Sequence, residues 1–429
     1  MNKKISIGAA IALVILTATL TLSITMVISQ RQFNKTVSDL NKRQEQYSYL
    51  VDIDKAIRQH FYGTIDEEKL HLALAGGMVD GLNDPYADYL TAAEYQKAQA
   101  WLTGTSTGLG LEITTNRAGQ IAVSMVYADS PAAKAGIAVG SIVTKIDETD
   151  ASTMSLKSVQ NKLDQSESVV LTLTADGKEA AHKLTAAPIV VTSVTGQMLE
   201  NNIAYIRIRS FRNNTPAQFT AVYDALIEQG AIAFVFDVRD NAGGSVEAMQ
   251  AVLNYLLPSG TYGAITTVGG QQTVLTATGT HSLEFSSITL INGNTEGEAE
   301  MFAAVMSKFA ASSTVGGKTA GRAMVQSFYT NSADGSAIKL TTGEMSATNV
   351  DATWEGEGLM PVVEALSVTD ESAVDLIPTV SDTQLGSALR LLEPAFNDPD
   401  NFVTATTTTT EIIQTKVTTE TTTTTKKKK

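Results

Sequence analysis

The chain has 429 residues, 43% of them hydrophobic, and it contains no cysteine. That length allows two or three domains with cores of their own. The lack of cysteine excludes thiol catalysis, disulfide bridges and cysteine-based metal sites. The formal net charge is −14, and only the two ends of the chain are basic. An acidic central part argues against nucleic acid as a partner, because phosphate binding needs a basic surface.

The N-terminal segment is typical of a membrane anchor. Residues 5–30 carry no charge, and the preceding residues 1–4 contain Lys3 and Lys4. As a helix, an uncharged run of that length spans a hydrocarbon core of ~30 Å. The positive-inside rule keeps residues 1–4 in the cytoplasm, so we expect a single-pass cell-membrane protein with its globular part outside. A cleaved signal peptide is the alternative, although no clear cleavage site follows the run.

The pattern beyond the anchor predicts an α+β chain of several domains. Residues 31–48 are polar and predict a helical stalk, and residues 49–104 give helical patterns broken by an Asp-Pro turn. Residues 105–187 contain short strand-like runs around one helix. In residues 188–370 strands alternate with helices, which predicts a mainly parallel sheet covered by helices.

Within residues 188–370 we expect particular elements. The expected strands are 202–208, 231–239, 287–292 and 313–317. The expected helices are 216–229, a helix that ends at Leu257, and 298–310. Residues 371–403 follow as a C-terminal part. Residues 404–429 are a threonine-rich tail that we expect to be disordered, because such a sequence cannot bury enough apolar surface to fold.

The segment 105–187 resembles a PDZ domain. The resemblance assigns its carboxylate-binding loop to the sequence GLGL, made of Gly108, Leu109, Gly110 and Leu111. Successive backbone N–H groups of such a loop hold a terminal carboxylate, and the peptide adds as a strand to the sheet edge. The run 130–147 is similar to the PDZ pattern SPAxxAGLxxGDxIxxI, with Ser141 in place of Asp. Leu156 and Gln160 would line the groove; a PDZ scaffold without a working groove is the alternative.

Several motifs in a row resemble the tail-specific, or C-terminal processing, serine peptidases. The matching segments are 56–95, 202–219, 236–244, 288–306 and 315–326. One departure is Ala242, where the family has Pro. The resemblance implies a PDZ domain inserted in an α/β core of the ClpP/crotonase-like type. It also implies binding of protein C-terminal tails or unfolded polypeptides, with no cofactor and no metal, and no particular oligomeric state.

The catalytic positions depart from that family. In the family a serine attacks the peptide carbonyl, a neutral lysine is its base, and a glutamine helps to hold the lysine. The motifs place Gly297 at the serine position, Arg322 at the lysine position and Gln326 at the glutamine position. Glycine offers no nucleophile, and arginine stays protonated and cannot act as a base. We therefore expect no hydrolysis by the family's mechanism.

The surroundings of the former nucleophile also differ from the family pattern. Gly243 and Gly244, together with the N–H of Glu298, keep the backbone of an oxyanion hole. Glu296 and Glu298 stand where the family has small residues. We expect an ion pair that fills the old site, between Arg322 and first Glu298, then Glu296.

Other hypotheses stay open. A displaced nucleophile would be Ser245, Ser312 or Ser313, although none has a lysine at the family's spacing. A carboxylate metal site would have no histidine nearby. No Ser-His-Asp triad is visible, because the four histidines lie in separate segments: His60, His71, His182 and His281. The favoured function is a pseudopeptidase that captures C-terminal tails; the alternatives are an active serine peptidase with a rearranged site and a structural surface protein.

Overall fold

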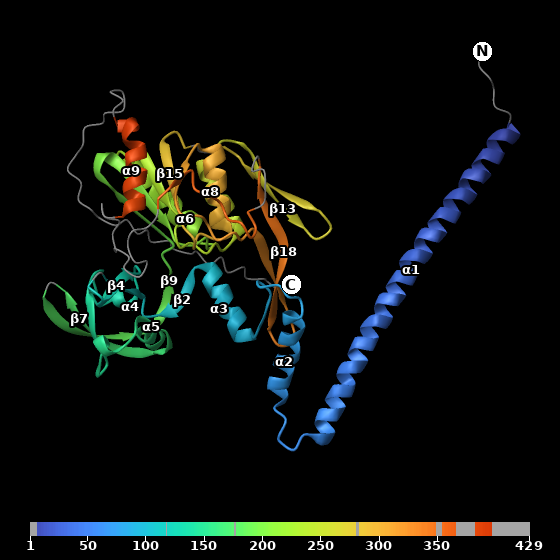
Figure 1. Cartoon of the computed structure of the whole chain (residues 1–429), viewed down its shortest axis with the longest axis horizontal. Helices are drawn as coiled ribbons and strands as arrows, with labels where there is room; N and C mark the ends of the chain where they lie inside the picture. Colours follow the sequence, from blue (N-terminus) through green and yellow to red (C-terminus); the bar gives the residue numbers. More distant parts are fainter. Residues whose placement is uncertain are drawn as a thin grey trace, which may run out of the picture. The chain divides into compact units, whose positions relative to one another are not determined.

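The chain folds into two compact units, one up to residue 75 and one from residue 76 (Figure 1). The structure, a computed structural model, describes residues 7–116, 118–175, 177–279, 283–348, 354–365 and 382–396. The tail expected to be disordered, residues 404–429, lies outside these ranges, and so does His281.

The first unit consists mainly of one long helix. Helix α1 (Ile7–His60) continues through the expected stalk at 31–48 without a break. Helix α2 (Glu67–Asp80) follows after a short loop. No helix within the described ranges is both long enough and apolar enough to cross a membrane. The anchor at 5–30 therefore stays a prediction.

The segment with the PDZ-like motifs forms a six-stranded sheet with the order β3-β4-β5-β7-β8, in which β6 also pairs with β5. Its strands are β3 (Leu111–Thr115), β4 (Ile121–Val126), β5 (Ile142–Ile146), β6 (Thr149–Asp150), β7 (Ser168–Ala175) and β8 (Lys178–Thr185). Its helices are α4 (Pro131–Lys134), the 3₁₀ turn η1 (Ala151–Thr153) and α5 (Leu156–Gln165). Val169, Leu171 and Leu173 alternate inward along β7, as expected for a strand with one face on a core. A two-stranded ribbon of β2 (Thr105–Gly108) and β9 (Ala187–Val190) connects this domain to the rest.

The larger core is built on a six-stranded sheet with the order β10-β11-β12-β15-β16-β19. Its strands are β10 (Val194–Met198), β11 (Ile203–Ile208), β12 (Ala233–Asp237), β15 (Ser286–Ile291), β16 (Ser313–Gly316) and β19 (Val363–Glu364), with the turn η2 (Glu200–Asn202) before β11. Only β10 runs antiparallel to its neighbour. The four expected strands are confirmed as β11, β12, β15 and β16.

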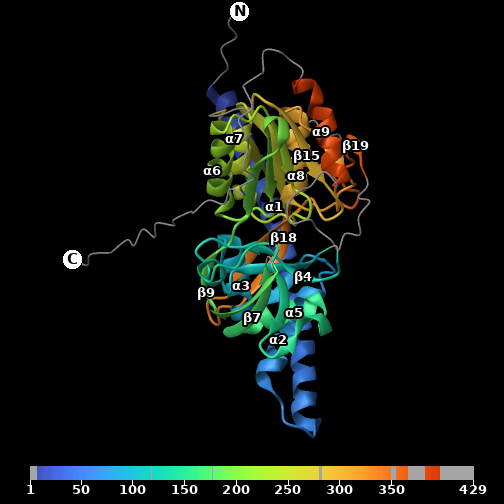
Figure 2. The ribbon, with the colours of Figure 1, turned by 90° about the vertical axis from the view of Figure 1, so that its left-hand side faces the viewer.

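Helices cover both faces of this sheet (Figure 2). One face packs against α6 (Thr215–Glu228), α7 (Val246–Leu256) and α8 (Glu298–Phe309), which confirms the three expected helices. The other face packs against α9 (Thr383–Phe396). Side chains alternate along β12, so that Phe234 and Phe236 join the first layer while Val235 joins the second. Burial of both faces explains why the parallel strands are apolar throughout.

A second sheet in the core was not predicted. It has the order β1-β18-β13-β14, and β17 also pairs with β18. Its strands are β1 (Asp88–Leu90), β13 (Gly260–Thr267), β14 (Gln272–Ala277), β17 (Met324–Thr330) and β18 (Ala337–Ala347). Helix α3 (Ala92–Thr103) follows β1 and starts with a capping box between Thr91 and Glu94.

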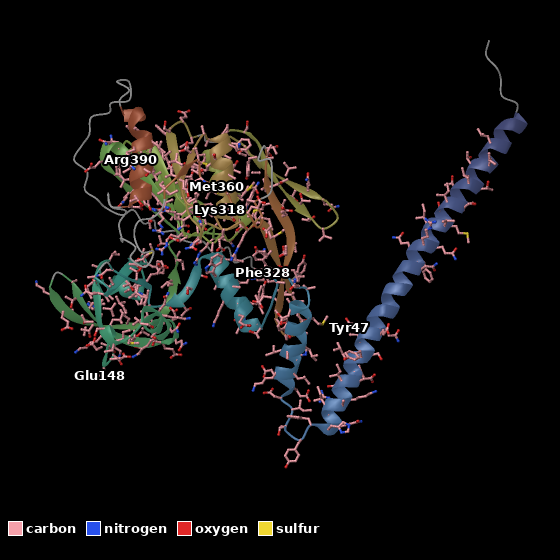
Figure 3. All side chains as sticks on the ribbon, in the orientation of Figure 1. Tyr47, Glu148, Lys318, Phe328, Met360 and Arg390 are labelled. Carbon is pink, nitrogen blue, oxygen red and sulfur yellow. The ribbon has the colours of Figure 1, made fainter. Side chains whose placement is uncertain are left out.

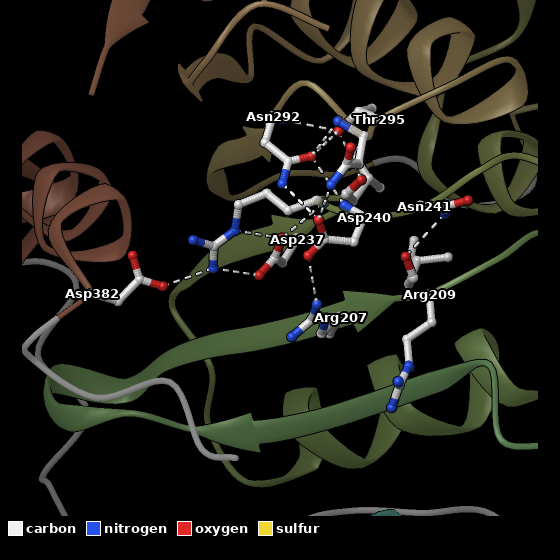
Figure 4. Close-up of polar contacts among 12 residues, drawn as sticks. Arg207, Arg209, Asp237, Asp240, Asn241, Asn292, Thr295 and Asp382 are labelled. Atoms are coloured by element: carbon white, nitrogen blue, oxygen red, sulfur yellow. Dashed lines mark hydrogen bonds and ion pairs between the residues drawn. The ribbon is translucent and has the colours of Figure 1, made fainter. Parts of the chain in front are cut away.

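The loops that follow the parallel strands are tied together by polar side chains (Figure 4). Asn292 and Asn294 donate from their side-chain amides to Asp240, at 2.8 and 3.0 Å. The Thr295 hydroxyl donates to the Val238 carbonyl at 3.0 Å. Because these bonds join the loop after β12 to the loop after β15, they fix the start of α8.

A buried ion pair lies at the end of β12. The fully buried Asp237 accepts hydrogen bonds from Arg239. Burial raises the pKa of Asp237, but the charges of Arg239 and Arg207 and the hydrogen bonds from Arg239 and Tyr205 together lower it to about 2. Arg239 also pairs with Asp382 at 2.8 Å and bonds the side chain of Gln384. These contacts attach the beginning of α9 to the sheet (Figure 4).

Candidate functional site

Gly297 lies at the turn between β15 and α8, where it is the N-cap residue of the helix. Its φ of 57° and ψ of −119° belong to a region that favours glycine. A sharp, strained turn between a strand and a helix is also where other hydrolases expose a nucleophile. A side chain would have room here, because a Cβ at 297 would have the Arg322 carbonyl oxygen as its neighbour, 4.0 Å away. The structure thus brings positions 297 and 322 together.

Glu300 holds these two positions in place. Its buried carboxylate accepts hydrogen bonds from the backbone N–H groups of Gly297, Gly321 and Arg322, at 3.1, 2.8 and 2.7 Å. The Thr319 hydroxyl donates to the same carboxylate. Burial raises the pKa of Glu300, and these four donors partly offset that rise. The start of α8 and the 319–322 loop therefore form one hydrogen-bonded unit.

Arg322 is held differently from our expectation. Its guanidinium pairs with Glu296, the second of the two expected partners, and it lies over the ring of Tyr86 at 5.8 Å from the centroid. The predicted pairing with Glu298 is wrong, because the Glu298 carboxylate accepts the backbone N–H of Gly244 instead. The Arg322 side chain is also 50% exposed. It is a half-exposed surface group and not a charge sealed inside a pocket.

The Glu298 side chain lies among the backbone groups that the sequence resemblance assigns to an oxyanion hole. Its Oε2 accepts the backbone N–H of Gly244 at 2.8 Å, and its own backbone N–H bonds the same carboxylate. A Cβ added at Gly243 would lie only 2.3 Å from this oxygen. Burial raises the pKa of Glu298 to about 7 against the lowering effect of the two N–H groups. The residue is 8% exposed. The Glu298 carboxylate therefore accepts two of the three backbone N–H groups that the sequence assigned to the hole, and the third, that of Gly243, donates to the side chain of Asn241 at 2.9 Å.

The third predicted catalytic position, that of the glutamine, lies on a strand. Gln326 lies in β17, and its side-chain amide donates to the Met324 carbonyl of the same strand at 3.0 Å. Glu355 accepts hydrogen bonds from the backbone N–H of Ala323, next to Arg322, and from the Tyr86 hydroxyl, at 2.6 and 3.4 Å. Sequence reasoning missed Glu355 and Tyr86, because both take part only through contacts across distant segments.

The three candidate serines all have structural surroundings. Ser245 caps α7: its hydroxyl donates to Glu247 at 2.8 Å and accepts the N–H of Ala248 at 3.1 Å. Ser312 is fully buried and shares a hydrogen bond with a threonine of β15, and Ser313 begins β16. Within the described residues, no group of three or more His, Asp or Glu side chains could hold a metal ion.

The GLGL loop in the PDZ-like domain is fixed through its carbonyl groups. The Gly110 carbonyl accepts from the N–H of Tyr127 at 2.9 Å and from the Ser130 hydroxyl at 3.1 Å. The Leu109 carbonyl accepts from the N–H of Ala132 at 3.0 Å. The N–H groups of Leu109 and Gly110 have no acceptor among the described residues. This arrangement leaves donors available to a terminal carboxylate.

Strand β3 and helix α5 are the two elements between which a PDZ domain holds its peptide. Among the described strands, β3 pairs only with β4, so one edge of β3 is open. Helix α5 packs against β3 and carries Leu156 and Gln160. Leu156 contacts the domain core, while Gln160 is exposed. A peptide can therefore add to the β3 edge.

A parallel sheet covered by helices, a PDZ-like domain with an open edge strand, and a strand–turn–helix site are the features that the sequence resemblance predicts for a PDZ-containing peptidase fold. Residues 202–365 match peptidase family S41, and residues 102–176 match the PDZ domain family.

Curated relatives and a solved structure agree with these matches. The chain is 26% identical to a CtpA-like serine protease of Staphylococcus epidermidis, over 86% of this chain and 74% of that protein. It is 25% identical to the carboxy-terminal processing protease CtpA of Bacillus subtilis, over 82% of this chain and 76% of that protein. The fold is similar to that of an S41 protease from Bacteroides fragilis, with a TM-score of 0.54, 18% identity and coverage of 73% and 87%. Together these matches support the tail-specific, or C-terminal processing, peptidase family for this chain.

Proposed function

We propose that this chain is a proteolytically inactive member of its family that binds the C-terminal tails of other proteins through its PDZ domain. The observation that carries the inactivity is the content of the old active site. Position 297 has no nucleophile, position 322 carries a permanent charge, and the Glu298 carboxylate accepts two of the three predicted oxyanion donors, the N–H groups of Gly244 and of Glu298 itself. Losing a nucleophile or a base removes most of the rate, and each lost oxyanion donor costs ~2.7–4 kcal/mol of transition-state stabilisation.

A proteolysis assay tests the inactivity. The full-length chain in a nonionic detergent is incubated with an unfolded protein that has an apolar C-terminus, and the products are followed by mass spectrometry. We expect no cleavage. The names of the curated relatives favour the alternative of an active peptidase, so Ser245→Ala serves as the second variant. Cleavage that disappears in Ser245→Ala would establish a rearranged site and end the proposal of inactivity.

Tail binding is supported by the free N–H groups of the GLGL loop and by the open edge of β3. Peptides with a free C-terminal carboxylate should bind at least tenfold more tightly than their amides, since a hydrogen bond to a charged group contributes ~1.5–3 kcal/mol. Gly110→Ala should abolish this difference, because its Cβ would lie 2.0 Å from the Ser130 Cβ.

The matched control is Gly119→Ala, in the turn between β3 and β4. Gly119 also has a positive φ, of 77°, but a Cβ there meets nothing within 4 Å. It should therefore add backbone strain to the same domain without touching the loop. Equal binding of acid and amide peptides would place recognition elsewhere. Absence of peptide binding would favour the structural surface protein.

We also propose that residues 5–30 anchor the chain in the cell membrane, with the PDZ domain and the core outside. The support is an uncharged run preceded by Lys3 and Lys4. The test is alkaline extraction of membranes from cells that express the full chain. The chain should stay in the pellet, and a variant with Leu16→Lys and Leu20→Lys should be released. Release of the unchanged chain would contradict the anchor.

A further inference from the structure

Arg212 lies in the loop between β11 and α6, and its guanidinium is oriented by two contacts. The group stacks over the ring of Trp101, 4.7 Å from the ring centroid. Its Nε donates to the Ser210 hydroxyl at 3.0 Å. A planar guanidinium fixed in this way keeps its two Nη groups as a fork of donors, the geometry that matches a carboxylate.

The loop that carries Arg212 is attached to the helix that carries Trp101. The N–H of Asn213 donates to the Leu102 carbonyl at 2.8 Å. The side-chain amide of Asn214 donates to the carbonyls of Gly104 and Val191, at 3.3 and 3.1 Å. Because these bonds hold the end of α3 against the loop, the guanidinium and the ring are arranged before any ligand binds. A ligand then loses little affinity to the ordering of its site.

The pair also lies next to the old oxyanion strand. Phe211, the neighbour of Arg212, forms a bridge to Gly244: its N–H donates to the Gly243 carbonyl at 2.9 Å, and its carbonyl accepts the N–H of Ser245 at 2.7 Å. A Cβ at Gly244 would be 3.3 Å from the Trp101 Cη2 atom. The Trp101 ring therefore lies directly beside the backbone of Gly244.

Arg212 is left with a charge that its own surroundings do not neutralise. The ionisable groups that act on it electrostatically are Glu112, Tyr127 and Arg209. Glu112 is the one carboxylate among these three, and it already bonds both Arg209 and the Tyr127 hydroxyl. None of the ion pairs found among the described residues includes Arg212. A partly buried cation without a carboxylate partner is costly unless a ligand supplies one.

We propose that the Trp101–Arg212 pair is a subsite for the carboxylate side chain of an aspartate or glutamate in the bound polypeptide, upstream of its C-terminus. The inference rests on the proposed binding of polypeptide tails, and it adds a sequence preference that the PDZ loop does not provide. The loop recognises the terminal carboxylate, whereas this subsite recognises an acidic side chain further along the chain. Trp101, which is 38% exposed, supplies the surface on which the adjacent part of the peptide lies.

The test uses fluorescent peptides that share one C-terminus, with a free carboxylate, and carry a single glutamate or the matching glutamine at successive upstream positions. Binding to the full-length chain in a nonionic detergent is followed by anisotropy. At one or two positions glutamate should bind about five- to tenfold more tightly than glutamine. Arg212→Gln should remove this preference. Arg390→Gln, which makes the same change of charge on α9 (Figure 3), should keep it.

Each outcome of these binding measurements either supports or refutes the proposed subsite. Binding without any glutamate preference, or a preference that survives Arg212→Gln, refutes the subsite while tail binding stands. Absence of binding by every peptide refutes both. A ligand-free measurement adds a further check: iodide should quench Trp101 fluorescence more strongly than caesium, and Arg212→Gln should remove that excess. The buried Trp354, 2% exposed, contributes little to quenching. Equal quenching by the two ions would show that anions do not reach the guanidinium.

Discussion

Replacing Glu298 by glutamine should change how the stability of the core depends on pH. The substitution keeps a side-chain oxygen that can accept the N–H of Gly244, but it removes the ionisable group. Burial raises the pKa of Glu298 from 4.5 to about 7. The folded wild-type chain therefore holds a proton on this group between those pH values, whereas the unfolded chain has released it. The stability that Glu298 contributes is complete below pH 4.5 and is lost as the pH rises through about 7.

The size of the effect follows from the difference in pKa. At ~1.36 kcal/mol for each pKa unit, the free energy of unfolding changes by about 3.4 kcal/mol over the full titration of Glu298. About 2.5 kcal/mol of it falls between pH 5 and pH 8. For a core of this size ~1 kcal/mol shifts the melting temperature by ~2–4 °C. The Glu298→Gln variant should thus gain about 5–10 °C relative to the wild type as the pH rises from 5 to 8.

Thermal melts followed by Trp354 fluorescence measure this gain. Trp354 belongs to the same core cluster as the buried residues of α8, and a Trp101→Phe background makes it the one reporter. The measured quantity is the change with pH in the difference between the two melting temperatures. A constant offset from the amide group of glutamine, or from the ionisable groups that both proteins share, does not affect it.

A difference that stays constant from pH 5 to pH 8 would refute this reasoning. It would mean that Glu298 ionises as an ordinary surface carboxylate, so that its side chain lies outside the oxyanion hole. A difference that decreases with rising pH would mean that hydrogen bonds to the ionised form outweigh burial.

Three further predictions concern the same site. Arg322→Ala should lower the free energy of unfolding in urea by about 1 kcal/mol or less, because the ion pair with Glu296 is half exposed. Glu300→Ala should lower it by about 3–5 kcal/mol, since it leaves four donors, two of them buried and two partly buried, without their acceptor, and Glu300→Gln should cost less. A fluorophosphonate probe should label the triple variant Gly297→Ser, Arg322→Lys and Glu298→Ala at least 100-fold faster than the double variant that keeps Glu298. Equal labelling of the two variants would show that the Glu298 carboxylate does not block the hole.

The elements that the sequence predicted well are those whose side chains form a local pattern. The apolar runs at β11, β12 and β15 are buried on both faces, which gives a strong signal without any knowledge of their neighbours. The second sheet lacks such a signal. Strands β13 and β14 are rich in threonine, glutamine and glycine, and their position depends on pairing with the distant β18. Pairing between distant segments cannot be read from local periodicity.

In the site, too, some features could be predicted from the sequence and others could not. Motif spacing predicted that positions 297 and 322 lie together, because the family fixes the chain between them. It did not predict which glutamate meets Arg322. Glu296 and Glu298 are two residues apart on either side of the turn at Gly297, and its backbone conformation sends them in different directions. That conformation has no signature in the sequence beyond the glycine itself.

The contacts of Glu300 explain how this fold can accept substitutions at the site during evolution. Three of its four hydrogen bonds come from backbone N–H groups, which every residue except proline provides. The geometry at positions 297 and 322 therefore does not depend on which side chains stand there. Substitution of the nucleophile and the base leaves the surrounding main chain supported. A peptidase of this architecture can lose its chemistry by point mutations while keeping the main-chain geometry of the site and its peptide-binding domain.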